Sequence, residues 1–269
     1  MTLAQLEGDS GKYLTLADEG TYAILTMKHE GDPYNKLDPG FTAALRGAFS
    51  YCDVSRTIKS VVVTGVGRVF SVGADIANLF PKLDAATAKR MAGSGTELNI
   101  MMEYISPVII AAINGVCLGG GFELALACDY RIASEKALLG QTEINLAMIP
   151  GGGGTQRLSR LVGRSRGIRV ACGGETFRAQ DALNMGIVDE VVPHDNLLNR
   201  AVEFCSLFAR KSKPAIGLAK KAVNQGLHLP LWYGILLESE LFASAWSLED
   251  RAEGVKAFLE KRRPEFKDR

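Results

Sequence analysis

Alternating and continuous apolar runs mark predicted strands in the first two thirds of the chain. Residues 13–27 alternate apolar and polar positions on both sides of an Asp-Glu-Gly turn, which predicts a β-hairpin. Residues 58–65 and 107–115 are short and largely apolar, as is typical of buried strands. Residues 129–134 and 186–192 predict further short strands.

Helical patterns occupy the segments between these strands. Asp38 and Pro39 predict the N-cap and the first turn of a helix that ends near Cys52. Residues 85–104 and 122–128 also have helical patterns. Buried strands that alternate with helices predict an α/β fold in which the strands are partly parallel.

The last third of the chain changes character, because only helices are predicted beyond His194. Prolines lie near the boundaries of four helices, at residues 195–212, 213–227, 229–247 and 248–262. We therefore expect an α/β core at residues 1–192 and a helical region at residues 193–269. The helical region is rich in Leu, Ala, Phe and Trp, so we expect it to cover the core or to contact a neighbouring subunit.

Composition and charge exclude several classes of function. The 269-residue chain has a formal net charge of +1, which gives no electrostatic reason to expect nucleic acid or a membrane surface as a partner. Its five cysteines are scattered and form no C-x-x-C pair, which favours reduced thiols over disulfides or a zinc site. No apolar run is long enough to span a bilayer, and residues 1–12 do not resemble a targeting peptide. We expect a cytoplasmic protein.

Two segments share the order of buried strand, glycine turn and helix: SVVVTGVGRVFSVGADI and PVIIAAINGVCLGGGFELALACD. Glycine lets a ligand approach the backbone, and the first N–H groups of a helix have no partner inside it. Two such N–H groups from different strand ends can converge on one oxygen and form an oxyanion hole. Ala74 and Gly120 are the best-placed donors. The alternative is that these glycines only permit tight turns and close packing.

Two carboxylates, Glu123 and Glu143, stand among apolar residues. Burial of a carboxylate is unfavourable unless the group is hydrogen-bonded or protonated. Two such acids that face one pocket could perform general acid–base chemistry, with pKa values raised by burial and by each other. The alternatives are that Glu123 only interacts favourably with the helix dipole and that Glu143 is a solvated loop residue. Spacing alone does not show that the two meet.

Other candidate motifs are weaker. The three histidines, His29, His194 and His228, lie far apart and match no metal-binding spacing. Asp75 follows the first glycine turn, where we expect it to cap a helix. Residues 151–163, GGGGTQRLSRLVG, are interpreted as a structural loop that enters a basic amphipathic helix.

Three blocks together resemble the signature of the enoyl-CoA hydratase/isomerase (crotonase) superfamily: FSVGADI, PVIIAAINGVCLGGGFELALACD and GQTEINLAMIPGGGGTQRLSRLVG. The resemblance continues to EGVKAFLEKRRPEF and covers nearly the whole chain. It implies a spiral of ββα turns with a C-terminal helical region, and assembly as a trimer or a dimer of trimers. It also implies an acyl-CoA thioester substrate, no metal and no cofactor other than the coenzyme A carried by the substrate.

The resemblance assigns roles to particular residues. It implies that Ala74 and Gly120 donate the oxyanion-hole N–H groups, and that Glu123 and Glu143 are the catalytic acids. In that arrangement Glu143 serves C2 of the substrate and Glu123 activates a water. It further implies a set of residues that bind substrate or coenzyme A: Lys28, Ser71, Gly73, Asp75, Ile76, Gly119 and, from a neighbouring subunit, Lys261.

The chain departs from the common family pattern at Lys36, Thr142 and Ala147. These departures are compatible with a substrate whose acyl group is not a simple straight chain. The leading interpretation is a hydro-lyase that hydrates a 2-enoyl-CoA to a 3-hydroxyacyl-CoA. A Δ3-Δ2 enoyl-CoA isomerase is an alternative, but such isomerases generally need only one of the two acids, so the presence of both favours hydration. A hydratase specialised for a branched, cyclic or aromatic acyl group is a further alternative, and a crotonase-fold binding protein is the non-enzyme alternative.

Overall fold

The computed structural model describes residues 10–269 and contains two β-sheets. The six-stranded sheet has the order β1-β2-β3-β5-β7-β10 and the four-stranded sheet the order β4-β6-β8-β9. The first comprises β1 (Leu14–Asp18), β2 (Tyr22–Met27), β3 (Ser60–Gly65), β5 (Val108–Ile113), β7 (Tyr130–Ser134) and β10 (Glu190–Val192). The second comprises β4 (Val69–Ser71), β6 (Val116–Leu118), β8 (Leu138–Gly140) and β9 (Thr176–Arg178). Among the strands of residues 10–269 only the β1–β2 and β8–β9 pairs are antiparallel, which confirms a partly parallel α/β fold.

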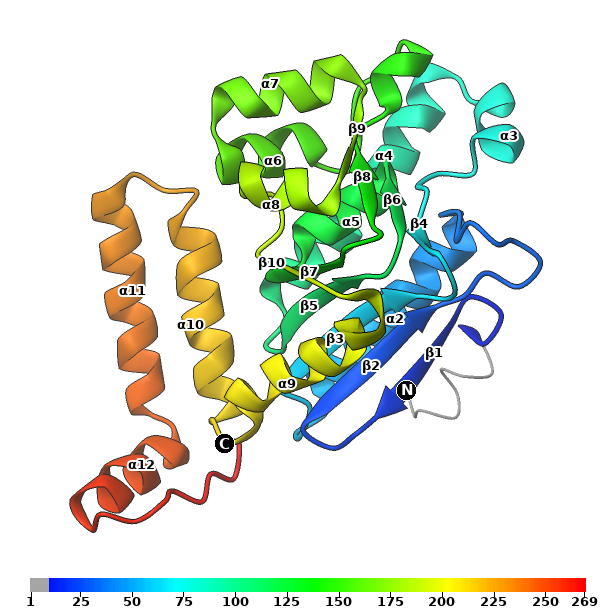
Figure 1. Ribbon diagram of the computed structural model, residues 1–269. Coiled ribbons are helices and arrows are strands. Elements are labelled where there is room, and N and C mark those ends of the chain that lie inside the picture. The colour runs from blue at the N-terminus through cyan, green and yellow to red at the C-terminus, as the bar shows by residue number, and fades with distance from the viewer. Residues whose placement is uncertain (1–9) are drawn as a thin grey trace.

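A repeated ββα turn generates both sheets. β3 is followed at once by β4, β5 by β6, and β7 by β8, so each turn adds one strand to each sheet (Figure 1). Gly115 lies at the corner between β5 and β6, where a Cβ atom would collide with the backbone carbonyl of Arg68. The predicted crotonase-type spiral is therefore the observed fold.

Helices follow or flank each turn of the spiral. They are α2 (Pro39–Val54), α3 (Ile76–Leu79), α4 (Ala85–Tyr104), α5 (Gly120–Ala127), α6 (Gly154–Val162), α7 (Arg164–Gly173), α8 (Ala179–Met185), α9 (Leu197–Ala209), α10 (Lys213–Gly226), α11 (Leu231–Trp246) and α12 (Glu249–Leu259). Three 3-10 helices are η1 (Phe80–Lys82), η2 (Glu143–Leu146) and η3 (His194–Asn196). Asp38 caps α2 as predicted, because its carboxylate accepts the N–H of Phe41 at 2.7 Å.

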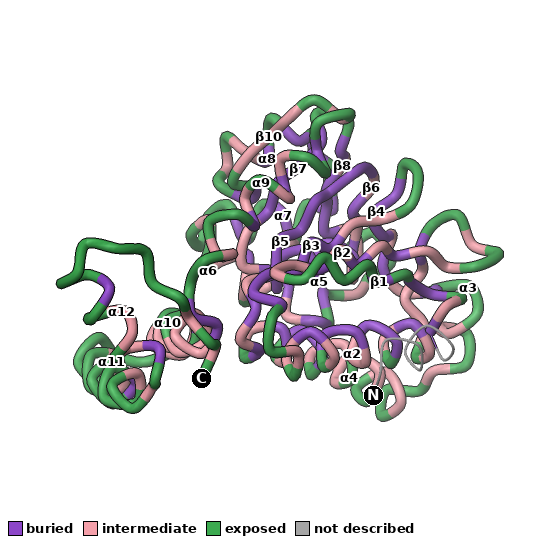
Figure 2. The backbone as a smooth tube through the Cα atoms, turned by 90° about the horizontal axis from the view of Figure 1, so that it is seen from below, coloured by how far each residue is buried: buried purple, intermediate pink, exposed green. Residues whose placement is uncertain are grey.

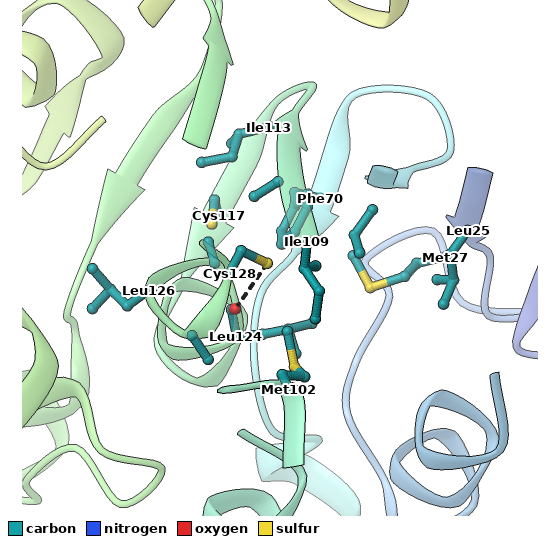
Figure 3. Packing of buried hydrophobic residues seen from close by; sticks show 14 of the residues in the cluster. Leu25, Met27, Phe70, Met102, Ile109, Ile113, Cys117, Leu124, Leu126 and Cys128 are labelled. Carbon is teal, nitrogen blue, oxygen red and sulfur yellow. Dashed lines mark hydrogen bonds between the residues drawn. The ribbon is translucent and has the colours of Figure 1, made fainter. Parts of the chain in front are cut away.

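The strands that read as continuous apolar runs are covered on both faces. In β5, Ile109 and Ala111 belong to the main core, whereas Ile110 and Ala112 pack in a second cluster with residues of α9. Figure 3 shows the main core around α5, where the thiol of Cys128 donates to the carbonyl of Leu124. Thus α9 packs on the six-stranded sheet, although it belongs to the predicted helical region at residues 193–269.

Beyond α9 the chain forms an arm that leaves the body (Figures 1 and 2). Two buried lysines of α10 anchor it. The ammonium of Lys220 donates to the carbonyls of Met102 and Pro107 at 2.8 and 2.9 Å, and Lys213 holds carbonyls at the end of α2. Lys220 is also 2.7 Å from the carboxylate of Asp129. By contrast, Leu241 is the one buried residue of α11.

The strands of the second sheet were not predicted from local patterns, because each is only three residues long. The predicted strand at 186–192 is shorter than expected: β10 covers Glu190–Val192, while Ile187 and Val188 are buried in the preceding turn. No helix among residues 10–269 has the length and apolar character that crossing a bilayer requires. The prediction about a targeting peptide falls mostly on residues 1–9, which lie outside the described part.

Candidate active site

One cavity of about 1100 Å³ opens beside the second sheet. It lies between α4, η2, the start of α5 and the loop after β4. The predicted site residues that line it are Ala74, Ile76, Gly119, Gly120, Glu123 and Glu143. Most of the remaining wall is apolar, with residues such as Leu79, Phe80, Leu98, Leu146 and Met148. The fold therefore brings both carboxylates to one place, which spacing alone did not show.

Two backbone N–H groups in this cavity have no acceptor within residues 10–269. Leu37 forms a parallel bridge with Ala74, in which its N–H donates to Gly73 and its carbonyl accepts from Asp75. That pattern leaves the N–H of Ala74 unbonded between them. Gly120 is the first residue of α5, so its N–H has no acceptor inside the helix. A Cβ on Gly120 would lie 3.7 Å from the nitrogen of Ala74, so the two segments lie close together at the cavity.

Glycine is required where these two chain segments meet. Gly73 has a φ of +85°, and a Cβ there would come within 2.6 Å of the Gly120 nitrogen. Gly119 has a φ of +51°, and a Cβ there would lie 3.3 Å from Oε1 of Glu143. These glycines do more than permit turns, because they bring the two N–H groups and a carboxylate together.

Glu123 lies in the first turn of α5 and is only 4% exposed. Its Oε1 accepts the N–H groups of Gly152 and Gly154 at 2.8 and 2.7 Å. Burial raises the pKa of Glu123 to about 7, and the charge of Glu143 acts in the same direction. The two N–H groups and the guanidinium of Arg157 oppose that rise. A carboxyl group that titrates near neutrality suits general acid–base chemistry.

Glu143 begins η2 and is half-buried, so the alternative of a solvated loop residue is wrong. Its Oε1 accepts from the amide of Gln141 at 2.9 Å. Its Oε2 is buried and has no partner among the described residues. Burial raises the pKa of Glu143, and the hydrogen bond from Gln141 counters part of that rise.

Sequence reasoning missed the residues that hold the two carboxylates. Residues 151–163 were assigned no chemistry, but Gly152 and Gly154 are the donors to Glu123. Gln141, which is fully buried, holds Glu143. A run of four glycines after a candidate acid was the one available signal, since it exposes several backbone N–H groups without side chains.

The other predicted substrate-binding residues divide into two groups. Ile76 and Gly119 line the cavity. Ser71 lies behind its wall, where its hydroxyl donates to the carbonyl of Asn35 and accepts from the N–H of Gly73. Asp75 occupies the N-cap position of α3, but its side chain accepts from the amide of Asn78 at 2.6 Å instead of from a backbone N–H. The expected side-chain cap is therefore absent.

The two predicted lysines do not line the cavity. Lys28 follows β2, and Lys261 follows α12, which lies at the opposite end of the molecule from α3 in Figure 1. Both lysine assignments stay predictions. Within residues 10–269 no group of three or more His, Cys, Asp or Glu side chains could hold a metal ion.

Comparison with known proteins identifies the family. A family model described as enoyl-CoA hydratase/isomerase matches residues 19–269. The chain belongs to this family. A 2,3-dehydroadipyl-CoA hydratase of Escherichia coli K12 is 41% identical over 235 residues, which cover 87% of this chain and 91% of that protein.

Further relatives agree with this assignment. A short-chain-enoyl-CoA hydratase of Clostridium acetobutylicum is 34% identical, with 94% of this chain and 97% of that protein covered. The crystal structure of an enoyl-CoA hydratase from Bacillus anthracis superposes with a TM-score of 0.89 at 34% identity, covering 96% of this chain and 100% of that one. The predicted superfamily, fold and enzyme class, a hydro-lyase, are confirmed.

The buried carboxyl group predicts a pH-dependent stability change for Glu123→Gln. The pKa of Glu123 is about 7 in the folded chain against an ordinary 4.5, so its contribution to stability is complete below pH 4.5 and is lost as the pH rises through 7. At pH 8 the free energy of unfolding of the variant should exceed that of wild type by up to about 3 kcal/mol. The difference should vanish near pH 4.5.

Urea unfolding at several pH values measures this difference. The control is Glu30→Gln, since Glu30 is exposed and its removal should change stability little at any pH. A difference for Glu123→Gln that does not vary with pH would contradict the prediction.

Proposed function

We propose that this chain hydrates 2-enoyl-CoA thioesters to 3-hydroxyacyl-CoA thioesters. The observation that carries the proposal is the presence of two carboxylates and two unbonded backbone N–H groups in one cavity. The names of the relatives from Clostridium acetobutylicum and Escherichia coli support the same reaction class. Coenzyme A enters as part of the substrate, and the reaction needs no other cofactor.

In this mechanism the thioester oxygen accepts hydrogen bonds from Ala74 and Gly120. These donors stabilise the negative charge that develops on that oxygen when water adds to C3. Glu123 and Glu143 hold the water between them. Ionised Glu123 takes a proton from the water, whose oxygen bonds to C3, while protonated Glu143 gives a proton to C2. Transfer of a proton from Glu123 to Glu143 restores the starting protonation of the pair.

A hydratase for a specialised acyl group is the second candidate. Two departures from the common family pattern, Thr142 and Ala147, line the cavity, and Ala147 adopts a φ of +56°, where glycine is the usual residue. Because two acids reach the cavity, hydration fits it better than isomerisation does. Rates with a panel of straight, branched, cyclic and carboxylated enoyl-CoA esters separate these candidates.

We also propose a homo-oligomer, as a trimer or a dimer of trimers. The C-terminal arm carries large apolar side chains that would be in contact with water in a monomer. Trp232 is 66%, Phe242 64% and Phe258 81% exposed. A cytoplasmic location is in keeping with the five free cysteines.

Light scattering should report three or six times the chain mass of 28.9 kDa. Trp232→Asp combined with Phe242→Asp should lower that mass, because both charges would enter an apolar interface. A monomeric wild type would contradict the proposed assembly.

Glu143→Gln should lower kcat for crotonyl-CoA hydration by about 10³-fold, because a positioned acid accounts for 10²–10⁴-fold. KM should change little, since the amide keeps the shape of the carboxyl group. Loss of the enoyl-thioester absorbance measures the rate. Near-normal turnover in this variant would rule out Glu143 as the acid, and no turnover by wild type with any enoyl-CoA would rule out the proposed function.

Gly120→Pro should lower kcat by about 10²–10³-fold, because it removes one oxyanion-hole donor. Proline fits the first position of a helix, so α5 should still form. The matched control is Gly120→Ala, which keeps the N–H and places its Cβ 3.4 Å from Cα of Gly73, an ordinary contact. Equal kcat values for the two variants would mean that the oxyanion hole lies elsewhere.

A further inference from the structure

The glycine run between η2 and α6 holds Glu123 through two separate peptide units. The N–H of Gly152 belongs to the unit that also carries the carbonyl of Gly151, and the N–H of Gly154 belongs to the unit of Gly153. Neither position has room for a side chain. A Cβ on Gly152 would lie 2.7 Å from Oε2 of Glu123, and a Cβ on Gly154 would lie 2.9 Å from Oε1. Glycines have the widest conformational freedom, so other residues must fix the shape of this run.

Side chains of α4 fix the carbonyl groups of the same run. The hydroxyl of Thr96 donates to the carbonyl of Gly151 at 3.1 Å, and the amide of Asn99 donates to the carbonyl of Gly152 at 2.9 Å. The Thr96 hydroxyl and the Glu123 carboxylate therefore bind opposite ends of one peptide unit. Hydrogen bonds in series polarise and strengthen one another.

Arg157 of α6 completes this arrangement. Its Nη1 donates to the carbonyl of Gly152 at 3.0 Å, and its Nε lies 2.6 Å from the carboxylate of Glu103 on α4. Residues 96, 99 and 103 follow one face of α4 at helical spacing. One helix face thus holds the carbonyls of Gly151 and Gly152, the second of them also through Arg157.

We propose that Thr96 and Asn99 are positioning residues for Glu123. Thr96 holds the carbonyl of the peptide unit whose N–H, that of Gly152, donates to Oε1 of Glu123. Asn99 holds the next peptide unit, which lies between the two donor units, and so fixes the path of the run between them. The catalytic role of Glu123 rests on the proposed function, whereas the tether itself does not.

The charged groups that face Glu123 stay in place when Thr96 is changed. They are Glu143 from η2 and Arg157 from α6, with Glu103 of α4 behind Arg157. The strands β4 and β6, which also contact α5, carry no charged side chain. Loss of the Thr96 hydroxyl therefore weakens the Gly152 N–H as a donor to ionised Glu123, and the pKa of Glu123 should rise.

The test compares Thr96→Val, which has nearly the same shape but no hydroxyl, with Thr96→Ser, which keeps the hydroxyl. Thr96 is half-buried, so both variants should fold. Glu97→Gln, at an exposed neighbouring position of α4, is the control. NMR of ¹³C-labelled glutamate carboxyl groups follows the titration of Glu123 without substrate, and Glu123→Gln assigns the signal. Thr96→Val should raise the midpoint by about half a pH unit.

The same variants are assayed for crotonyl-CoA hydration against pH. In Thr96→Val, kcat below the midpoint should fall about threefold, which corresponds to half a pH unit, with KM unchanged. Thr96→Ser and Glu97→Gln should match wild type in both measurements. The proposal is overturned if Thr96→Val titrates like the control, or if Thr96→Ser shifts as far as Thr96→Val.

The two measurements separate failure of the tether from failure of the function. A shifted titration in a chain that hydrates no enoyl-CoA supports the tether and rejects the proposed function. An unshifted titration in an active enzyme rejects the tether alone. Asn99→Leu provides a second variant, and its midpoint should also rise above that of the control.

Discussion

The candidate active site depends on a contact between two pieces of backbone with no side chain between them. Gly73 and Gly120 follow β4 and β6, which are parallel neighbours in the second sheet, so both strands end at the same edge. The spiral produces that adjacency, because each ββα turn places its short strand beside that of the preceding turn. The N–H groups of Ala74 and Gly120 then face one cavity as a direct result of strand order.

The second constraint is a carboxyl group whose burial lowers the stability of the folded chain. Glu123 is almost fully enclosed, and only the two glycine N–H groups and Arg157 favour its charged form. A stronger set of donors would keep Glu123 permanently ionised. Without any donors, Glu123 would stay protonated. Backbone donors whose geometry is set from α4 give an intermediate result, which is the condition that proton transfer near neutral pH requires.

Much of this arrangement could be predicted from local patterns. The hairpin, the cap of α2 and the helix at residues 85–104 follow from alternation, capping residues and periodicity. The second sheet could not, because strands of three residues show no period and are held by tertiary pairing. At the site, glycine turns and isolated acids indicated Glu123 and Glu143. The groups that hold Glu123 escaped notice because they are backbone atoms of glycines, which leave no side-chain pattern to recognise.

One further consequence follows from the way α4 is buried. Its three buried residues, Leu98, Asn99 and Met102, all lie in its second half, where Lys220 also holds its final turn. The first half, with Ala88 and Ala92, lines the cavity but carries no buried residue of its own. No residue of that half makes a hydrogen bond to Glu123 or to the carbonyls of Gly151 and Gly152, although Ala92 lies against Gly151. The first half of the helix thus shapes the cavity, whereas the second half also holds the glycine run.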